Sequence, residues 1–173
     1  MNLQPTLEND IVLLRPLKNE DFEYLYDIAK DPLIWEQHHS DRFKRNEFEL
    51  FFKDSLESNG ALVVIDKISK KIIGSSRFKK IEATEKGIEI GWSFLSREYW
   101  GGEFNKEIKK LMIDYVLENV DNVVFYINKE NIRSQKAVEK INGKKIDGFE
   151  YQHLINKNPN ILTYLITRND RQS

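Results

Sequence analysis

The segment from Gly87 to Val116 changes its hydrophobic period from two to 3.6 across two adjacent glycines, which favours a strand, a turn and a helix in that order. Gly101 and Gly102 allow a sharp turn that leaves the first helical N–H groups uncovered. These groups and the positive helix end suit a phosphate or pyrophosphate. A turn that merely needs glycine explains the same residues equally well. The apolar residues at helical spacing are Phe104, Ile108, Leu111, Met112, Tyr115 and Val116.

The whole chain predicts the element order β-α-α-β-β-β-α-β-α-β-β, with no repeat and no linker. The fold class is therefore α+β (mixed α/β), with helices on both faces of a mixed, mostly antiparallel sheet. One domain is expected over residues 1–173, with its core at about 11–167. Asn19 is the expected N-cap of the first helix, and the polar tail from Arg168 is expected to fray. Strands are expected at Ile11–Arg15, Ala61–Asp66, Lys71–Lys80, Gly87–Leu95, Asn122–Ile127, Lys144–Ile155 and Ile161–Thr167, and the other helices at Arg45–Ser58 and Asn131–Asn142.

Composition excludes several classes of function. The chain has 173 residues, a formal net charge of −1 and no cysteine, so a disulfide framework, a thiolate metal site and a cysteine nucleophile are ruled out. Its charges are interleaved, with no basic stripe, so no nucleic-acid partner is expected. The three histidines lack HExxH-type spacing, so no metal is expected. No run resembles a signal peptide or a membrane span, and we expect a cytoplasmic location without a membrane partner.

The predicted strand Gly87–Leu95 has two different faces. One is small and polar with a single carboxylate, Glu89, and suits either solvent or a cleft that admits a ligand. Glu89 is thus a candidate general base, acting directly or through water, although a solvated strand glutamate is the commoner case. Alternation places Ile88, Ile90, Trp92 and Phe94 on the core face, and Gly87, Glu89, Gly91 and Ser93 on the other.

Asn131 and Ser134 stand where a predicted strand leads into a short helix. Asn131 is a natural N-cap, worth about 1 kcal/mol, and Ser134 falls in the first turn, where its hydroxyl can point outward. Capping alone explains both residues. In a functional interpretation, Asn131 holds a ligand amide and Ser134 protonates a leaving thiolate.

Three segments in this order resemble the GNAT N-acetyltransferase superfamily, and within it the branch of ribosomal-protein N-terminal (alanine) acetyltransferases. The opening Leu14-Arg15-Pro16-Leu17 with Asp21 also resembles this branch, and the element order agrees from about Ile11 to Thr167. Any single motif is weak, but the ordered set is specific. The three segments are Ile88-Glu89-Ile90-Gly91-Trp92, Arg97 to Asn105, and Asn131-x-x-Ser134 followed by Ala137, Glu139, Lys140 and Gly143.

The resemblance implies a sheet that splays apart in a V between Gly87–Leu95 and Asn122–Ile127. Acetyl-CoA would place its pantetheine in the gap and its pyrophosphate on the glycine turn. Glu89 would be the base and Ser134 the proton donor to the CoA thiolate. Trp35, His38 and Glu89 are expected to face the acceptor, although for Trp35 and His38 packing of their own loop or exposure to solvent is the commoner case. The residues expected to hold acetyl-CoA are Phe94, Leu95, Arg97, Trp100, Gly101, Gly102, Glu103, Phe104, Asn105, Lys106, Asn131 and Ser134.

Glu103 departs from the family pattern, which has glycine or alanine at this position. A carboxylate beside a pyrophosphate would repel it unless the side chain turns to water, so weaker acetyl-CoA binding is expected. Countercharge for the phosphates could come from four cations: Arg97, Lys106, Lys109 and Lys110.

The function expected from these features is acetyl-CoA-dependent N-acetyl transfer to a primary amine, either a protein N-terminus or a small molecule. Because the chain has no cysteine, the amine would attack the thioester directly in a ternary complex. Backbone N–H groups near Trp92–Leu95 would stabilise the oxyanion. The alternative is a non-catalytic module of the same fold that binds CoA or acyl-CoA. The resemblance is also compatible with a homodimer.

Overall fold

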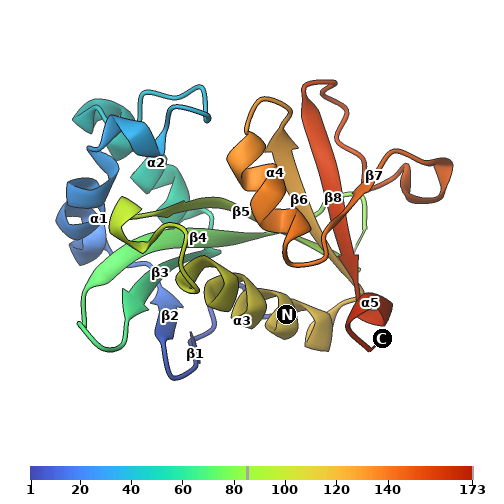
Figure 1. Ribbon diagram of the computed structural model, residues 1–173, viewed down its shortest axis with the longest axis horizontal. Helices are drawn as coiled ribbons and strands as arrows, with labels where there is room; N and C mark the ends of the chain where they lie inside the picture. Colours follow the sequence, from blue (N-terminus) through green and yellow to red (C-terminus); the bar gives the residue numbers. More distant parts are fainter. Residues whose placement is uncertain (85, 173) are drawn as a thin grey trace.

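The computed structural model describes residues 1–84 and 86–172, which form an eight-stranded sheet flanked by helices (Figure 1). The strand order is β1-β2-β3-β4-β5-β6-β8-β7, and every pairing is antiparallel except that of β5 with β6. This confirms the predicted fold class. The strands are β1 (Leu7–Glu8), β2 (Val12–Pro16), β3 (Ala61–Asp66), β4 (Ile72–Lys80), β5 (Gly87–Leu95), β6 (Asn122–Asn128), β7 (Lys144–Ile146) and β8 (Ile161–Thr167). The helices are α1 (Phe22–Ala29), α2 (Arg45–Glu57), α3 (Phe104–Asn119), α4 (Ile132–Glu139) and α5 (Arg168–Gln172), and the 3-10 turns are η1 (Asn19–Asp21), η2 (Pro32–Ile34), η3 (Arg97–Tyr99) and η4 (Phe149–Tyr151).

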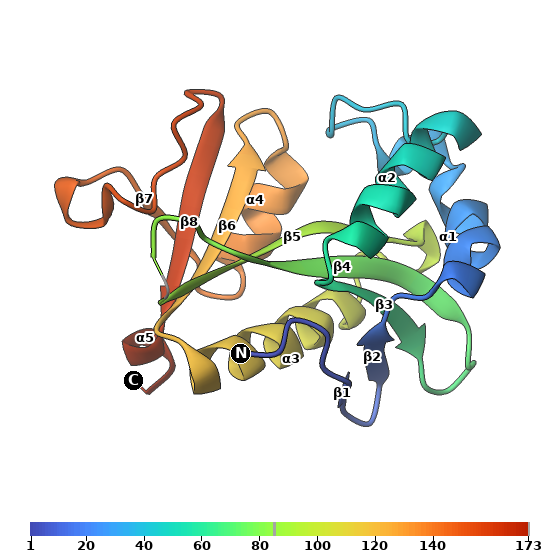
Figure 2. The same cartoon turned by 180° about the vertical axis from the view of Figure 1, so that it is seen from behind.

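Helices cover the central strands on both faces (Figures 1 and 2). On one face, α1 and α2 bury Leu25, Phe48 and Phe52 against β3 and β5. On the other, α3 buries Met112 and Val116 against β3, β5 and β6. Because both faces are covered, β3 is a nearly continuous apolar run and does not alternate. Within residues 1–84 and 86–172, no helix is long and apolar enough to cross a bilayer.

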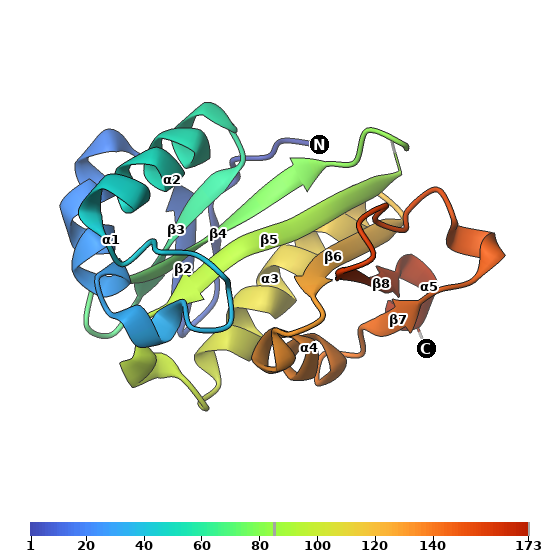
Figure 3. The same cartoon turned by 90° about the horizontal axis from the view of Figure 1, so that it is seen from above.

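The sheet opens between β5 and β6. These parallel strands pair only from Gly87 opposite Asn122 to Glu89 opposite Val124. Beyond Glu89 they diverge, as Figure 3 shows, while β5 continues to Leu95. The splay expected between these strands is therefore confirmed. In the described part of the chain, the far half of β5 has no strand partner on its β6 side, which leaves backbone polar groups facing the opening.

Asn19 does not cap the first helix as predicted. Asn19–Asp21 forms the turn η1, and α1 begins only at Phe22. Asp21 occupies the N-cap position of α1, although its side chain makes no capping hydrogen bond to that helix. Its carboxylate instead accepts the N–H of Lys18 at 2.9 Å and so closes the turn η1. The same carboxylate accepts two hydrogen bonds from the Arg15 guanidinium, each 2.8 Å, so a buried bidentate pair ties β2 to the start of α1.

The C-terminal region differs from the prediction in two places. The expected strand Lys144–Ile155 ends at Ile146, because the chain leaves the sheet to bury Leu154 against β6 and β8. The segment from Arg168 forms the helix α5, and so the expectation of fraying is wrong for residues 168–172. The Arg168 guanidinium holds it there by donating to the carbonyls of Leu117 (2.8 Å) and Val120 (3.0 Å). Ser173 lies outside the described residues.

Candidate active site

A β-bulge reverses the side-chain alternation of β5. Ser75 of β4 pairs with Phe94, but Arg77 pairs with Gly91, so β5 has one extra residue between these two points. The extra residue is accommodated at Trp92, whose φ of +51° lies in the left-handed region that bulky residues rarely adopt. Past the bulge, Phe94 packs on the α1–α2 side of the sheet and Leu95 on the α3 side.

The predicted faces of β5 are therefore correct only before the bulge. Ile88 and Ile90 face α3, as expected for core residues. Trp92 and Phe94 instead face the α2 side, where Trp92 lines a cleft with residues of α2. Ser93 was expected beside Glu89, but it points to α3. A period-two pattern cannot reveal one inserted residue, and this insertion exchanges the two faces.

Glu89 occupies the last residue pair before β5 and β6 diverge. Its carboxylate lies beside Gly91, because a Cβ on that glycine would be 3.4 Å from Oε1. Burial raises the pKa of Glu89 to about 7, while the positive charges of Lys79 and Arg77 oppose this rise. A carboxyl group that titrates near neutral pH can accept a proton as a general base.

Tyr126 of β6 is a neighbour of Glu89 that the sequence did not single out. Its hydroxyl donates to the carbonyl of Leu154 at 2.8 Å. Burial, followed by the charge of Glu89, raises the pKa of Tyr126. Tyr126 comes two residues after Val124, which pairs with Glu89. The sequence contains Tyr126, but recognising it as a neighbour of Glu89 requires knowing how β5 and β6 are aligned in their parallel pairing.

The glycine turn is open to a ligand. Gly101 has a φ of +73°, and a Cβ added to either Gly101 or Gly102 would meet no heavy atom within 4 Å. The helix α3 begins at Phe104, and Glu103 occupies its N-cap position without a capping hydrogen bond from the side chain. An open backbone before an uncapped helix start suits the pyrophosphate that the sequence predicted there. Glu103 is exposed, so its carboxylate can turn to water.

The cations expected near the glycine turn differ in their exposure and in their partners. Lys106 is exposed, whereas the Arg97 guanidinium is engaged by Asp31 at 2.5 Å and keeps the pKa of that carboxyl low. Lys109 is only 7% exposed and lies between α3 and the sheet. The prediction that it could supply countercharge to phosphates is therefore wrong. Phe104 and Asn105 are half-buried, and the Phe104 ring packs edge-on against Tyr99 with the centroids 4.8 Å apart.

Asn131 is the N-cap of α4, since its Oδ1 accepts the N–H of Ser134 at 3.1 Å. Asn131 is buried, while Ser134 in the first turn of α4 is half-buried. The capping interpretation thus describes Asn131. It uses only the amide oxygen, so it does not conflict with a second role for the amide nitrogen.

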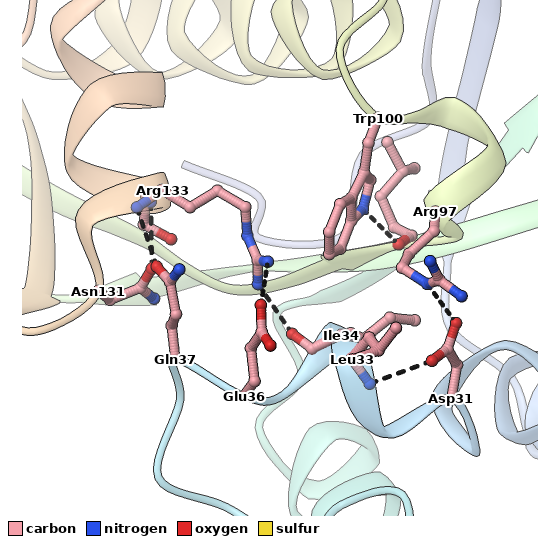
Figure 4. Close-up of polar contacts among 11 residues, drawn as sticks. Asp31, Leu33, Ile34, Glu36, Gln37, Arg97, Trp100, Asn131 and Arg133 are labelled. Carbon is pink, nitrogen blue, oxygen red and sulfur yellow. Dashed lines mark hydrogen bonds and ion pairs between the residues drawn. The ribbon is translucent and has the colours of Figure 1, made fainter.

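Arg133 joins three segments that are far apart in the sequence (Figure 4). Its guanidinium carbon lies 4.1 Å from the centroid of the Trp100 ring, and its Nη2 donates to the carbonyl of Ile34 at 2.9 Å. Its backbone N–H donates to Gln37 Oε1 at 3.0 Å. The start of α4, the turn before α3 and the segment after α1 therefore meet at one point. Trp100 is also anchored by its own Nε1, which donates to the carbonyl of Leu95 at 2.9 Å. No local pattern marked Arg133 or Gln37, because both act through tertiary contacts.

Trp35 and His38 mainly pack the segment that joins α1 to α2. Trp35 is 2% exposed, its Nε1 donates to the carbonyl of Ala29 at 2.7 Å, and its ring packs against Phe94. His38 packs edge-on against Trp35. Burial, reinforced by the charges of Arg42 and Arg133, lowers the pKa of His38 to about 4. Trp35 therefore supports the wall of the site from behind.

An open cleft of about 500 Å³ lies beside Trp92, between the segment before α2, α2 itself and β5. Its wall mixes charged and aromatic groups. Arg42 stacks on Phe51 at 4.3 Å from the ring centroid, and Arg77 stacks on Trp92 at 4.4 Å. Because Trp92 shares the strand face of Glu89, the cleft approaches the candidate base from the α2 side.

The chain matches the model of the acetyltransferase (GNAT) domain over residues 12–144. It belongs to the GNAT family. Solved structures with the same fold include a GCN5-related N-acetyltransferase from Brucella melitensis (TM-score 0.80, 19% identity, covering 96% of this chain and 80% of that one). A second is the spermidine N-acetyltransferase from Vibrio cholerae in complex with CoA and spermine (TM-score 0.70, 17% identity, 95% and 100% covered). A third is a Vibrio cholerae protein to which ribosomal-protein-serine acetylation has been provisionally assigned (TM-score 0.75, 15% identity, 96% and 99% covered). Membership of the GNAT family supports acetyl transfer from acetyl-CoA as the activity of this protein.

Proposed function

We propose that this GNAT protein transfers the acetyl group of acetyl-CoA to a primary amine, by direct attack within a ternary complex. The observation that carries the proposal is the divergence of β5 from β6 immediately after Glu89. It leaves a free strand edge beside a carboxyl group whose pKa is raised to about 7. A pantetheine arm laid along this edge would bring the thioester toward the bulge at Trp92, with the pyrophosphate on the turn at Gly101 and Gly102.

In the proposed reaction, the neutral amine nitrogen attacks the thioester carbonyl carbon and the C–S bond breaks. The proton that the amine loses passes to Glu89 and then to solvent. The CoA thiolate takes a proton from the Ser134 hydroxyl, which regains one from water. Free N–H groups of the β5 edge near Trp92–Leu95 would stabilise the oxyanion. Holding both substrates in one complex supplies much of the rate.

The pKa of Glu89 favours an acceptor whose amine is easily made neutral. Burial raises this pKa to about 7, although Lys79 and Arg77 oppose the rise. A protein α-amine has a pKa of about 7.7–8.0, against roughly 10.4 for a lysine-like amine, so it needs little help to become neutral. A base with a pKa near 7 is matched to that task. We therefore propose a protein N-terminus as the acceptor, as in the ribosomal-protein branch, ahead of a small polyamine.

The test is calorimetry with acetyl-CoA, followed by thiol release with peptides of different N-terminal residues and with spermidine. Binding with release on a peptide supports the proposal. Release on spermidine alone refutes the choice of acceptor, and absence of binding refutes the function. Glu103 at the glycine turn favours one alternative, a GNAT-fold module that binds CoA without turnover. Binding without release on any acceptor would support that alternative.

A further inference from the structure

Lys109 is a buried amine for which the proposed reaction has no use. It lies in α3 and faces the sheet with 7% of its surface exposed. Its Nζ donates to Ser93 Oγ at 2.5 Å and to Ser76 Oγ at 3.3 Å, and these two hydroxyls are 2.7 Å apart. Nζ also lies 6.0 Å from the ring centroid of Phe125. One amine therefore contacts β4, β5 and β6 at the same time.

This arrangement is costly, because a buried amine needs either a counterion or complete hydrogen bonding. In the described part of the chain, no carboxylate lies within ion-pair distance of Lys109. The groups that face it from the three strands are Ser76, Ser93 and the Phe125 ring, of which none carries a charge. Burial alone lowers the pKa of Lys109 to about 7. An apolar side chain would fill the same space without this cost.

Ser93, the nearer of the two hydrogen-bond partners of Lys109, lies at the bulge. Ser93 follows Trp92, whose left-handed φ of +51° marks the extra residue of β5. The inserted residue is what turns the Ser93 hydroxyl toward α3 and into reach of the amine. The same stretch of β5 has lost β6 as a partner and faces the opening. Lys109 thus holds, from behind, the part of the strand that would face a thioester.

We propose that Lys109 is a positioning residue for acyl transfer, which fixes the bulge through Ser93 and, as an ammonium, places a positive charge behind the N–H groups that meet the thioester carbonyl. The proposal rests on the proposed acetyl transfer. It explains why an amine is kept at a site where packing alone favours an apolar residue. A bulge held at a single hydrogen-bonded serine keeps donors oriented, and preorganised donors are the main source of oxyanion stabilisation. The ammonium form would be the active one, so activity should decline as the pH rises above the point at which Lys109 loses its proton.

The first test compares the full-length wild-type chain with Lys109→Met and Ser93→Ala. Both variants should melt cooperatively and bind acetyl-CoA within about threefold of wild type, because neither residue faces the opening. The kcat should fall at least tenfold in Lys109→Met, and the decline of activity at high pH should disappear. Ser93→Ala should lower kcat in the same direction without changing KM for acetyl-CoA. A kcat within twofold of wild type in Lys109→Met, at every pH, would overturn the proposal.

The second test needs no turnover, so it separates failure of this inference from failure of the proposed function. Backbone amide resonances of Trp92, Ser93 and Phe94 are followed by NMR between pH 5.5 and 9. We expect a titration near pH 7 in the wild type that is lost in Lys109→Met. Glu89 also titrates near pH 7 on the same strand, so Glu89→Gln is the control that must keep the Lys109 titration. Identical titrations in wild type and Lys109→Met would show that Lys109 does not act on the bulge.

Discussion

Replacing Lys109 with methionine should change the stability of the chain in a strongly pH-dependent way. Methionine is of similar length and adapts to irregular core space, so it can fill the gap between α3 and the sheet. In the wild type, burial lowers the pKa of this amine from 10.5 to about 7. Between these two values the unfolded chain binds more protons than the folded chain, so wild-type stability rises with pH. The methionine variant lacks this dependence.

The size of the effect follows from the two pKa values. Each pH unit between them is worth about 1.4 kcal/mol, so ionisation destabilises the wild type by about 4 to 5 kcal/mol below pH 7. The penalty is about 4 kcal/mol at pH 7.5 and about 1 to 2 kcal/mol at pH 9.5. Losing the hydrogen bonds to Ser76 and Ser93 costs about 1 to 3 kcal/mol, independently of pH in this range. The stability of Lys109→Met relative to wild type should therefore fall by about 2 to 3 kcal/mol from pH 7.5 to pH 9.5.

Urea unfolding followed by circular dichroism at pH 7.5 and 9.5 measures this difference directly. Lys110→Met is the matched control, because Lys110 is the next residue of α3 and is exposed. Its stability relative to wild type should be the same at both pH values. If the Lys109→Met difference is also constant between pH 7.5 and 9.5, the amine does not titrate as a buried group, and the argument from burial is wrong.

Four other changes test the candidate site. Glu89→Gln should lower kcat about 100-fold. It should also remove the rise of activity that the wild type shows as the pH approaches about 7 from the acid side, because the base acts in its ionised form; pH–rate profiles decide this. Glu103→Gly should tighten acetyl-CoA binding about threefold in low salt by removing an exposed like charge, and unchanged affinity in calorimetry would contradict the repulsion. Gly101→Ala should cost about 1 kcal/mol in thermal unfolding because of its φ of +73°, and an unchanged Tm would show that the turn relaxes. Arg133→Ala should speed amide hydrogen exchange over residues 33–38 at least fivefold, and equal exchange would show that the segment holds without this bridge.

The sequence was sufficient for the architecture because burial repeats with the period of each element. The strand β3 and the helix α3 were predicted from periodicity, and the opening between β5 and β6 from the family resemblance. The predictions of local structure failed where contacts with other segments decided the role of a side chain. Asp21, and not Asn19, stands at the N-cap position of α1, and its carboxylate is held by the Lys18 N–H and by Arg15. The contact with Arg15 requires β2 to lie next to the start of α1, and a local sequence pattern does not reveal that two elements are neighbours.

The two largest departures from the predicted pattern, the burial of Lys109 and the bulge in β5, are connected. Helical spacing placed Lys109 on the apolar stripe, since Met112, Ile113 and Val116 follow it by three, four and seven residues. Its charge argued for the surface, and the bulge that reverses the faces of β5 was hidden from any period-two pattern. The reversed face presents Ser93 to α3, and the buried amine needs that hydroxyl. Each departure therefore stabilises the other. Violations of local rules that compensate in pairs are expected at functional sites, and this pair lies where the sheet opens.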